Sequence, residues 1–174
     1  MNRPQEFEYA QSPYTSRYIG LVEGNDVLGQ LRKGMNEVTV LFTSLTSEQL
    51  QYRYAPGKWS LLELLRHMVD TERVMSYRAL CIARGEKQAL PGFDENTYAR
   101  QAAGTITSFA DVLKEYQLIR EANLLLFSSF TEETLYRLGN ANGKDISARA
   151  ILFIIAGHEQ HHLHVIQEKY LSNE

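Results

Sequence analysis

The sequence lacks the features that mark secreted, membrane-spanning and disulfide-stabilised proteins. Cys81 is its only cysteine, so no disulfide can form within the chain. Its longest uninterrupted apolar run covers 150–156, far short of the roughly 20 apolar residues of a transmembrane helix. The first residues carry no apolar stretch of the kind found in signal peptides. We therefore expect a cytoplasmic protein that does not enter the membrane.

Clustered positive charge is also missing. The chain has 18 lysines and arginines against 21 aspartates and glutamates, a formal net charge of −3, and no block of like charges. Because nucleic acids and anionic membranes are bound chiefly through clustered lysine and arginine, this balance argues against both as partners. A small-molecule substrate is the expected partner.

What the sequence does contain is a series of helical patterns in a chain of single-domain length. With 174 residues, a chain can bury about 70% of its unfolded surface in one core. We expect one domain over 1–174, with 1–19 as an extended or loosely helical lead-in. No segment alternates with period two for long enough to be a strand, so the predicted fold class is all-α. Apolar residues recur at helical spacing in four segments: 20–45, 60–84, 108–129 and 147–171.

The segments between these helices carry turn signals. Ser60 and Glu63 form a capping-box pattern at the start of the second helix, and Gly85 marks its end. The connection over 85–107 is too long and irregular to be only a turn, and such segments often serve as lids or binding loops. A short helical stretch precedes the loop 139–143, which is rich in glycine and asparagine.

Four of the five histidines lie within the seven residues 158–164, in the last predicted helix. Imidazole is the commonest protein ligand for zinc-like metals, so this run indicates a metal site. At roughly 100° per residue, His158 and His162 fall in the middle of the apolar stripe of that helix, where each must be hydrogen-bonded or metal-bound. Two buried imidazoles on one stripe favour the metal. His161 lies on the flank and His164 on the far side, where neither needs such a partner.

The run from His158 to His162 also matches the His-Glu-x-x-His pattern of zinc metalloproteases, in which Glu159 would be the general base. Only twelve residues follow His162, and the extended pattern with a third histidine is absent. A further ligand must therefore come from upstream, where His67 is the only other histidine, and three imidazoles would give an open, catalytic type of zinc site. The helical wheel of 60–84 places His67 at the border of the apolar face, which fits an exposed histidine as well as a ligand.

Glu72 is a carboxylate near the centre of the apolar face of that same helix. It could support a metal ligand, act as a general base, or form a buried ion pair with an arginine such as Arg78. The ion pair is the default, because buried carboxylates need partners. Glu72 and Glu159 are thus the candidate catalytic residues, whereas Cys81 is expected to be an inert core residue rather than a nucleophile.

Several parts of the sequence together resemble the DinB/YfiT-like superfamily. They are Pro56-Gly57-Lys58-Trp59-Ser60-Leu61 leading into a helix with His67, then Asp70-Thr71-Glu72-Arg73, and finally Gly157-His158-Glu159-Gln160-His161-His162. The loop Leu90-Pro91-Gly92-Phe93-Asp94 is similar to one branch of the group. The resemblance spans about 20–171 and implies a four-helix bundle with a long crossover connection.

The resemblance also implies a divalent metal, zinc or nickel, held by three histidines: His67, His158 and His162. The additional nitrogens of His161 and His164 make a ligand swap possible. Similar proteins include thiol S-transferases and isomerases that use low-molecular-weight thiols, and proteins described as metal-dependent hydrolases. We therefore expect a metal-dependent enzyme acting on a small molecule, with thiol transfer favoured over hydrolysis, in a chain that forms homodimers.

Two alternatives to an enzyme stay open. The first is a non-catalytic stress-response bundle with a structural metal, in which a fourth protein ligand such as His161 or Glu72 fills the coordination sphere. The second is a bundle that binds no metal and whose histidines only form hydrogen bonds in the core.

Overall fold

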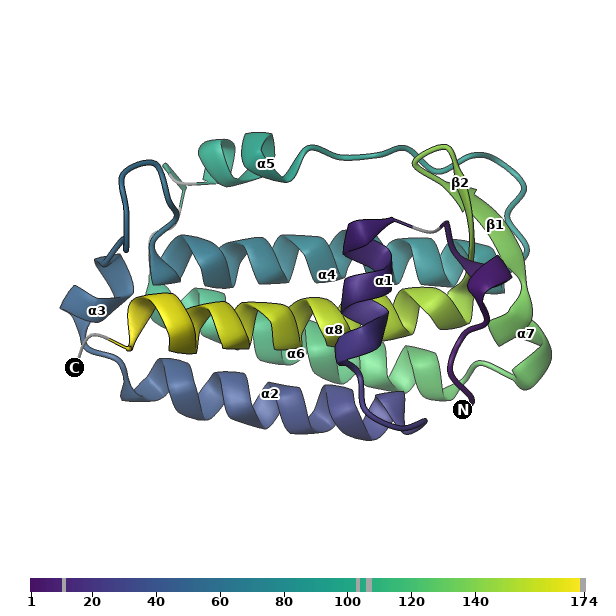
Figure 1. The fold of residues 1–174 in the computed structure, drawn as a ribbon, viewed down its shortest axis with the longest axis horizontal. Helices are drawn as coiled ribbons and strands as arrows, with labels where there is room; N and C mark the ends of the chain where they lie inside the picture. The colour runs from purple at the N-terminus through teal and green to yellow at the C-terminus, as the bar shows by residue number, and fades with distance from the viewer. Residues whose placement is uncertain (11, 103, 106–107, 173–174) are drawn as a thin grey trace.

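The computed structural model describes residues 1–10, 12–102, 104–105 and 108–172. Four long helices form its body, as Figure 1 shows: α2 (Val27–Ser44), α4 (Leu61–Ala83), α6 (Phe109–Ser128) and α8 (Ala148–Val165). Helix α8 packs on α2 and α4, and α6 packs on the same two helices. The all-α four-helix bundle expected from the sequence is confirmed. None of the helices in the described ranges is long and apolar enough to span a membrane.

Short polar side chains start the four bundle helices. Each helix follows a residue whose side chain accepts a hydrogen bond from the backbone N–H three residues further on: Asp26, Ser60, Ser108 and Ser147. These caps satisfy donors that no helical carbonyl can reach. The capping box predicted for Ser60 and Glu63 is present, and α4 ends just before Gly85, whose φ of +86° suits a glycine. Helices α4 and α6 therefore lie within one residue of their predicted bounds.

One connection runs back along the length of the bundle. Helices α4 and α6 are neighbours that point the same way, so the chain between them must return from one end to the other (Figure 1). Helix α5 (Glu95–Ala102) forms part of this return and packs on α4. The predicted crossover is confirmed, but α5 was not predicted, because it is polar and buries only Ala99. Thr107, the last predicted position of the connection, lies outside the described residues.

The single helix predicted over 20–45 is wrong at its start. Helix α1 (Pro13–Leu21) ends before a turn in which Gly24 has a φ of +63°, and Asp26 then caps α2. The Gly-Asn-Asp sequence of this turn outweighs the apolar spacing around it, because all three residue types favour turns. The lead-in 1–19 holds most of α1 and is therefore more regular than expected.

Short elements complete the chain: η1 (Glu6–Glu8), α3 (Ser47–Gln51), α7 (Glu132–Tyr136), β1 (Leu138–Ala141), β2 (Lys144–Ser147) and the π-helical turn η2 (Ile166–Tyr170), which extends α8. The expectation that no strand would form is wrong, since β1 and β2 pair antiparallel. Asn142 and Gly143 join them with φ values of 54° and 71°, as a tight two-residue hairpin requires. Strands of four residues are too short to show an alternating pattern in the sequence.

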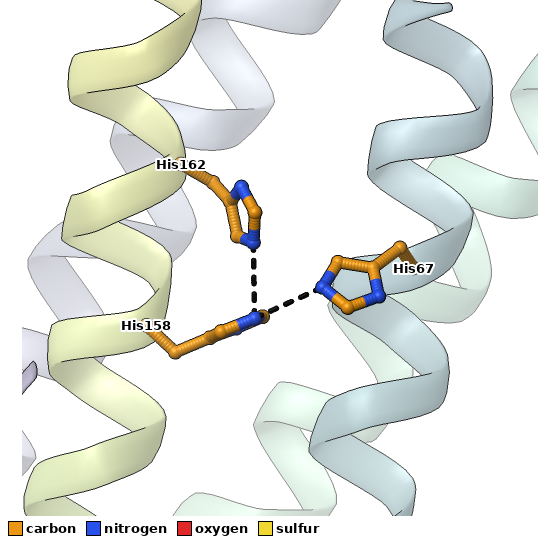
Figure 2. A group of neighbouring side chains, drawn as sticks. All are labelled: His67, His158 and His162. Atoms are coloured by element: carbon orange, nitrogen blue, oxygen red, sulfur yellow. Dashed lines mark hydrogen bonds between the residues drawn. The ribbon is translucent and has the colours of Figure 1, made fainter. Parts of the chain in front are cut away.

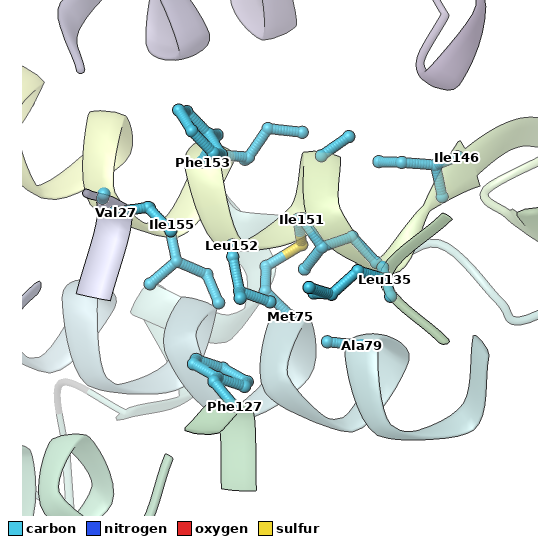
Figure 3. Packing of buried hydrophobic residues seen from close by; sticks show 14 of the residues in the cluster. Val27, Met75, Ala79, Phe127, Leu135, Ile146, Ile151, Leu152, Phe153 and Ile155 are labelled. Atoms are coloured by element: carbon cyan, nitrogen blue, oxygen red, sulfur yellow. The ribbon is translucent and has the colours of Figure 1, made fainter. Parts of the chain in front are cut away.

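The core surrounds α8, as the apolar residues in Figure 3 show. Residues 151–154 of this helix are all buried, so its first half has no exposed side. The cause is α1, which crosses the face of α8 that the sequence pattern left to solvent (Figure 1). At the crossing, a side chain on Gly157 would overlap the backbone carbonyl of Tyr18. Glycine therefore allows the close approach of the two helices.

Candidate metal centre

Three histidines converge between α4 and α8. His67 projects from α4, and His158 and His162 project toward it from successive turns of α8 (Figure 2). The Nε2 atom of His158 lies 3.0 Å from Nε2 of His67 and 3.0 Å from Nε2 of His162. One ligand atom from each residue lies within 4.8 Å of the other two. His67 is only 5% exposed, so it is buried, a point that the helical wheel of 60–84 left open.

Burial keeps the three imidazoles neutral. Desolvation lowers the pKa of His67 to about 4. Desolvation, followed by the neighbouring histidines, also holds the pKa values of His158 and His162 well below the ordinary value. A neutral imidazole offers the lone pair that a metal ion needs. At neutral pH the site is therefore prepared for a cation.

Hydrogen bonds alone do not satisfy this arrangement. Nε2 of an imidazole can carry a proton or a lone pair, but not both. Nε2 of His158 lies between two other Nε2 atoms and can make a hydrogen bond to only one of them. One divalent cation would use all three lone pairs at once, and three histidines are a known ligand set of catalytic zinc. The donor set thus fits the divalent metal expected from the sequence.

A buried ion network lies next to the histidines. Arg120 donates from Nε and Nη2 to the two carboxylate oxygens of Glu72, both at 2.8 Å, and from Nη2 to Oε2 of Glu159 at 2.6 Å. The hydroxyl of Tyr116 also donates to Glu159. Burial raises the pKa of Glu159 although Arg120 opposes the shift, as expected when two carboxylates share one guanidinium. A cation on the neighbouring His158 would favour the charged form of Glu159.

The two candidate catalytic glutamates both belong to this network. Glu72 forms a buried ion pair, as predicted. Its partner is Arg120, so the prediction that Arg78 would be the partner is wrong. Arg78 instead donates to the carbonyl of Pro91 at 2.7 Å. The pattern of one helix could not identify the partner, because Arg120 comes from α6. Glu159 also pairs with Arg120, and the catalytic roles of both glutamates stay predictions.

The other candidate side chains lie outside the cluster. His161 is half-buried beside Tyr18, at 5.6 Å between ring centroids, and its Nδ1 has no hydrogen-bond partner in the described part of the chain. His164 is exposed. Cys81 is half-buried on α4, and its distance from His67 in sequence corresponds to about 21 Å along the helix. None of these three side chains belongs to the group whose ligand atoms lie within 4.8 Å of one another.

Comparison with known proteins identifies the family. A family model described as the DinB superfamily matches residues 30–166. The chain belongs to the DinB superfamily. This DinB protein is 29% identical over 138 residues, 78% of its own length and 79% of the relative, to an Oceanobacillus iheyensis protein named "Putative metal-dependent hydrolase OB0413".

A solved structure has the same fold as this DinB protein. It is YfiT from Bacillus subtilis, described as a probable metal-dependent hydrolase with an unusual four-helix bundle topology. The TM-score is 0.70 at 19% sequence identity, and the match covers 95% of this chain and 89% of YfiT. The family resemblance inferred from the sequence is confirmed.

Two features of the DinB site were not predicted. The first is Arg120, although Tyr116, Arg120 and Asn123 are polar residues at helical spacing on the buried stripe of α6. A charged residue on such a stripe needs a buried partner, and this requirement could have pointed to Glu72. The second is the contact of Trp59 with His67, whose ring centroids lie 4.6 Å apart.

A cavity of about 290 Å³ opens beside the histidines of the DinB protein. Its lining includes His162, Trp59, Lys58 and Asn96. The last three residues also line an adjoining hollow of about 480 Å³. Of the three clustered histidines, His162 lines the cavity, and Trp59, which packs on His67, forms another part of its wall. Its size suits a small molecule.

Proposed function

We propose that this DinB protein is a metal-dependent hydrolase of a small molecule, with a zinc or nickel ion held by His67, His158 and His162. The convergence of three buried, neutral imidazoles beside a cavity is the observation that carries the proposal. The names of the Oceanobacillus relative and of YfiT both refer to metal-dependent hydrolases, which supports it. Three protein ligands also leave a coordination position free for water or substrate.

A divalent ion at this position would lower the pKa of a bound water and polarise a substrate carbonyl. The residues of the chain prepare the site for that chemistry. Burial keeps the imidazoles neutral. Thr71 Oγ1 lies 3.5 Å from Nδ1 of His67 and helps to orient the ring of that histidine. Trp59 shields one side of that ring from water. Lys58 and Asn96 supply polar groups that can orient a substrate in the cavity.

A specific observation favours thiol transfer as a second candidate. A carboxylate general base commonly assists the activation of water, but the 290 Å³ cavity that His162 lines has no carboxylate among its described lining residues. Glu72 and Glu159 are held by Arg120 instead. A thiol ionises far more readily than water and needs less help from a base. A low-molecular-weight thiol is therefore the second substrate class that we propose.

Metal analysis tests the site. The native protein and its His67→Ala, His158→Ala and His162→Ala variants would be loaded with zinc or nickel, and bound metal would be measured by mass spectrometry. We expect stoichiometric metal in the native protein and loss of most of it in each variant. His164→Ala is the matched control, because His164 is exposed and should leave the metal content unchanged. Undiminished metal in the His158 and His162 variants would contradict the site.

Turnover distinguishes the two reactions. The metal-loaded protein would be supplied with panels of esters, amides and alkylating electrophiles, each with and without small thiols. Consumption of an ester or amide without thiol identifies hydrolysis, whereas turnover that requires thiol identifies transfer. Metal binding without turnover in either assay would support the non-catalytic alternative, and a fourth protein ligand would then be sought at His161 or Glu72.

A further inference from the structure

A separate hollow of about 300 Å³ lies between α4 and the start of the crossover connection. The histidines of the metal cluster do not line it. The hollow includes part of the Leu90–Asp94 segment, which the sequence singles out and which the proposed function does not use. Most of its lining is apolar or aromatic: Val74, Tyr77, Leu90, Pro91, Phe93 and Tyr98.

Arg78 lines this hollow and is a buried cation without an anion. The residue is 8% exposed, and in the described part of the chain no carboxylate forms an ion pair with it. Burial lowers the pKa of the Arg78 guanidinium, and no acidic neighbour opposes this shift. The other buried arginines of the described residues, Arg120 and Arg149, are each paired with glutamate. Arg78 is thus the exception among them.

The guanidinium of Arg78 is held in place and has donors left over. Nη2 donates to the carbonyl of Pro91 at 2.7 Å, and Nη1 lies 3.4 Å from the weak acceptor Sδ of Met75. A guanidinium has five N–H groups, so three of those on Arg78 have no described partner. Arg73, at the edge of the hollow, is already neutralised by Glu115 at 2.8 Å. The unbalanced positive charge of the hollow therefore comes from Arg78.

The hollow also offers an apolar surface next to that charge. The guanidinium of Arg78 lies 5.7 Å from the ring centroid of Phe93, which forms one wall. A buried guanidinium is unfavourable without a counter-charge, and a carboxylate matches its planar fork with two parallel hydrogen bonds. The volume is at the lower end of small-molecule sites, which span about 300–1,000 Å³.

We propose that this hollow binds a small carboxylate with an apolar or aromatic body. The carboxylate pairs with Arg78, and the body packs against Phe93, Tyr77 and Tyr98. The expected ligand has the size and chemistry of an arylalkanoic acid. The site is distinct from the metal centre, since Arg78 and His67 are about 16 Å apart along α4.

Binding of a matched acid and amide tests the proposal. The metal-loaded, full-length protein would be titrated with 4-phenylbutyrate and with uncharged 4-phenylbutyramide, followed by calorimetry and by NMR. We expect saturable binding of the acid, at least about tenfold tighter than binding of the amide, because only the acid makes charge-assisted hydrogen bonds. Chemical-shift changes should be confined to α4 and to residues 90–98.

Three variants complete the test. Arg78→Met removes the charge at similar length, so acid and amide should bind equally, whereas Phe93→Ala should weaken both ligands alike. Arg32→Met, at an exposed position of α2, is the matched control and should change neither affinity. Thermal unfolding would establish that each variant is folded, and the comparison of acid with amide on the native protein stands without any variant.

Three outcomes would overturn the proposal. They are equal affinity of acid and amide for the native protein, absence of saturable acid binding, and an unchanged preference for the acid in Arg78→Met.

Discussion

Nη2 of Arg120 lies 2.6 Å from Oε2 of Glu159, the residue that follows His158 in the chain. The same guanidinium binds Glu72, which follows His67 by five residues on α4. One arginine of α6 therefore fixes carboxylates on α4 and α8, the two helices that carry the clustered histidines. The relative position of these helices, and with it the spacing of the three nitrogens, depends on this buried ion network.

Replacing Arg120 by methionine should destabilise the fold severely. The change leaves two buried carboxylates without a cation, and breaking a buried pair in this way costs about 3–5 kcal/mol. Urea unfolding of Arg120→Met and of the native protein would measure the difference. The exposed Arg32→Met variant should stay within about 0.5 kcal/mol of the native protein. A loss below about 1 kcal/mol in Arg120→Met would contradict the role given to the network.

Adding one methyl group to Gly157 should loosen the crossing of α1 over α8. The new Cβ would overlap the carbonyl of Tyr18, which is backbone and cannot rotate away. We expect Gly157→Ala to lose about 1–3 kcal/mol in thermal or urea unfolding. Gly20→Ala is the matched control, because nothing lies within 4 Å of a Cβ there and a helical alanine is favourable. Equal stability of the two variants would contradict the close approach.

Acid should destabilise the metal-free protein between pH 6.5 and about 4. The pKa of His67 is 6.5 in an unfolded chain and about 4 when buried, so in this window the unfolded state binds the proton and the folded state does not. Linkage then lowers the free energy of unfolding as pH falls, by about 3 kcal/mol for this residue, and the loss levels off below pH 4. Urea unfolding of chelator-treated protein at several pH values would measure the slope. His67→Leu should show a weaker pH dependence, and an identical one would refute the assignment.

Nickel binding should quench the fluorescence of Trp59. This residue is the only tryptophan, and its ring centroid lies 4.6 Å from that of His67. We expect nickel to lower the emission, a chelator to restore it, and closed-shell zinc to change it less. In His67→Ala the tryptophan remains but the ion should not bind beside it. Quenching of equal size in that variant would mean that nickel binds elsewhere.

Relationships within one helix could be predicted from the sequence, and those between helices mostly could not. His158 and His162 lie one turn apart on an apolar stripe, so their shared direction follows from helical geometry. The place of His67 required the family resemblance, because its own pattern left burial open. The pairing of Glu72 with Arg120 depends on how α6 packs on α4, and the apolar pattern of one helix does not show how two helices pack. Cytoplasmic location and dimer formation stay predictions.

The crossing of α1 over α8 was hidden for a related reason. Gly157 has no side chain to add to a hydrophobic pattern, so the face that it opens for Tyr18 looked solvent-exposed. The sequence pattern also did not separate α1 from α2, because apolar spacing continues across the turn at Gly24. Packing that depends on the absence of a side chain is the hardest kind to infer from periodicity.

The separation of 91 residues between His67 and His158 has a consequence for the lifetime of the molecule. A metal ion bound to both would be a reversible cross-link that closes a long loop and is lost whenever the chain unfolds. Its contribution to stability grows with the logarithm of free metal concentration, because only the folded state holds the site. The same chain would then resist proteolysis in a metal-replete medium and be degraded faster when that metal is scarce.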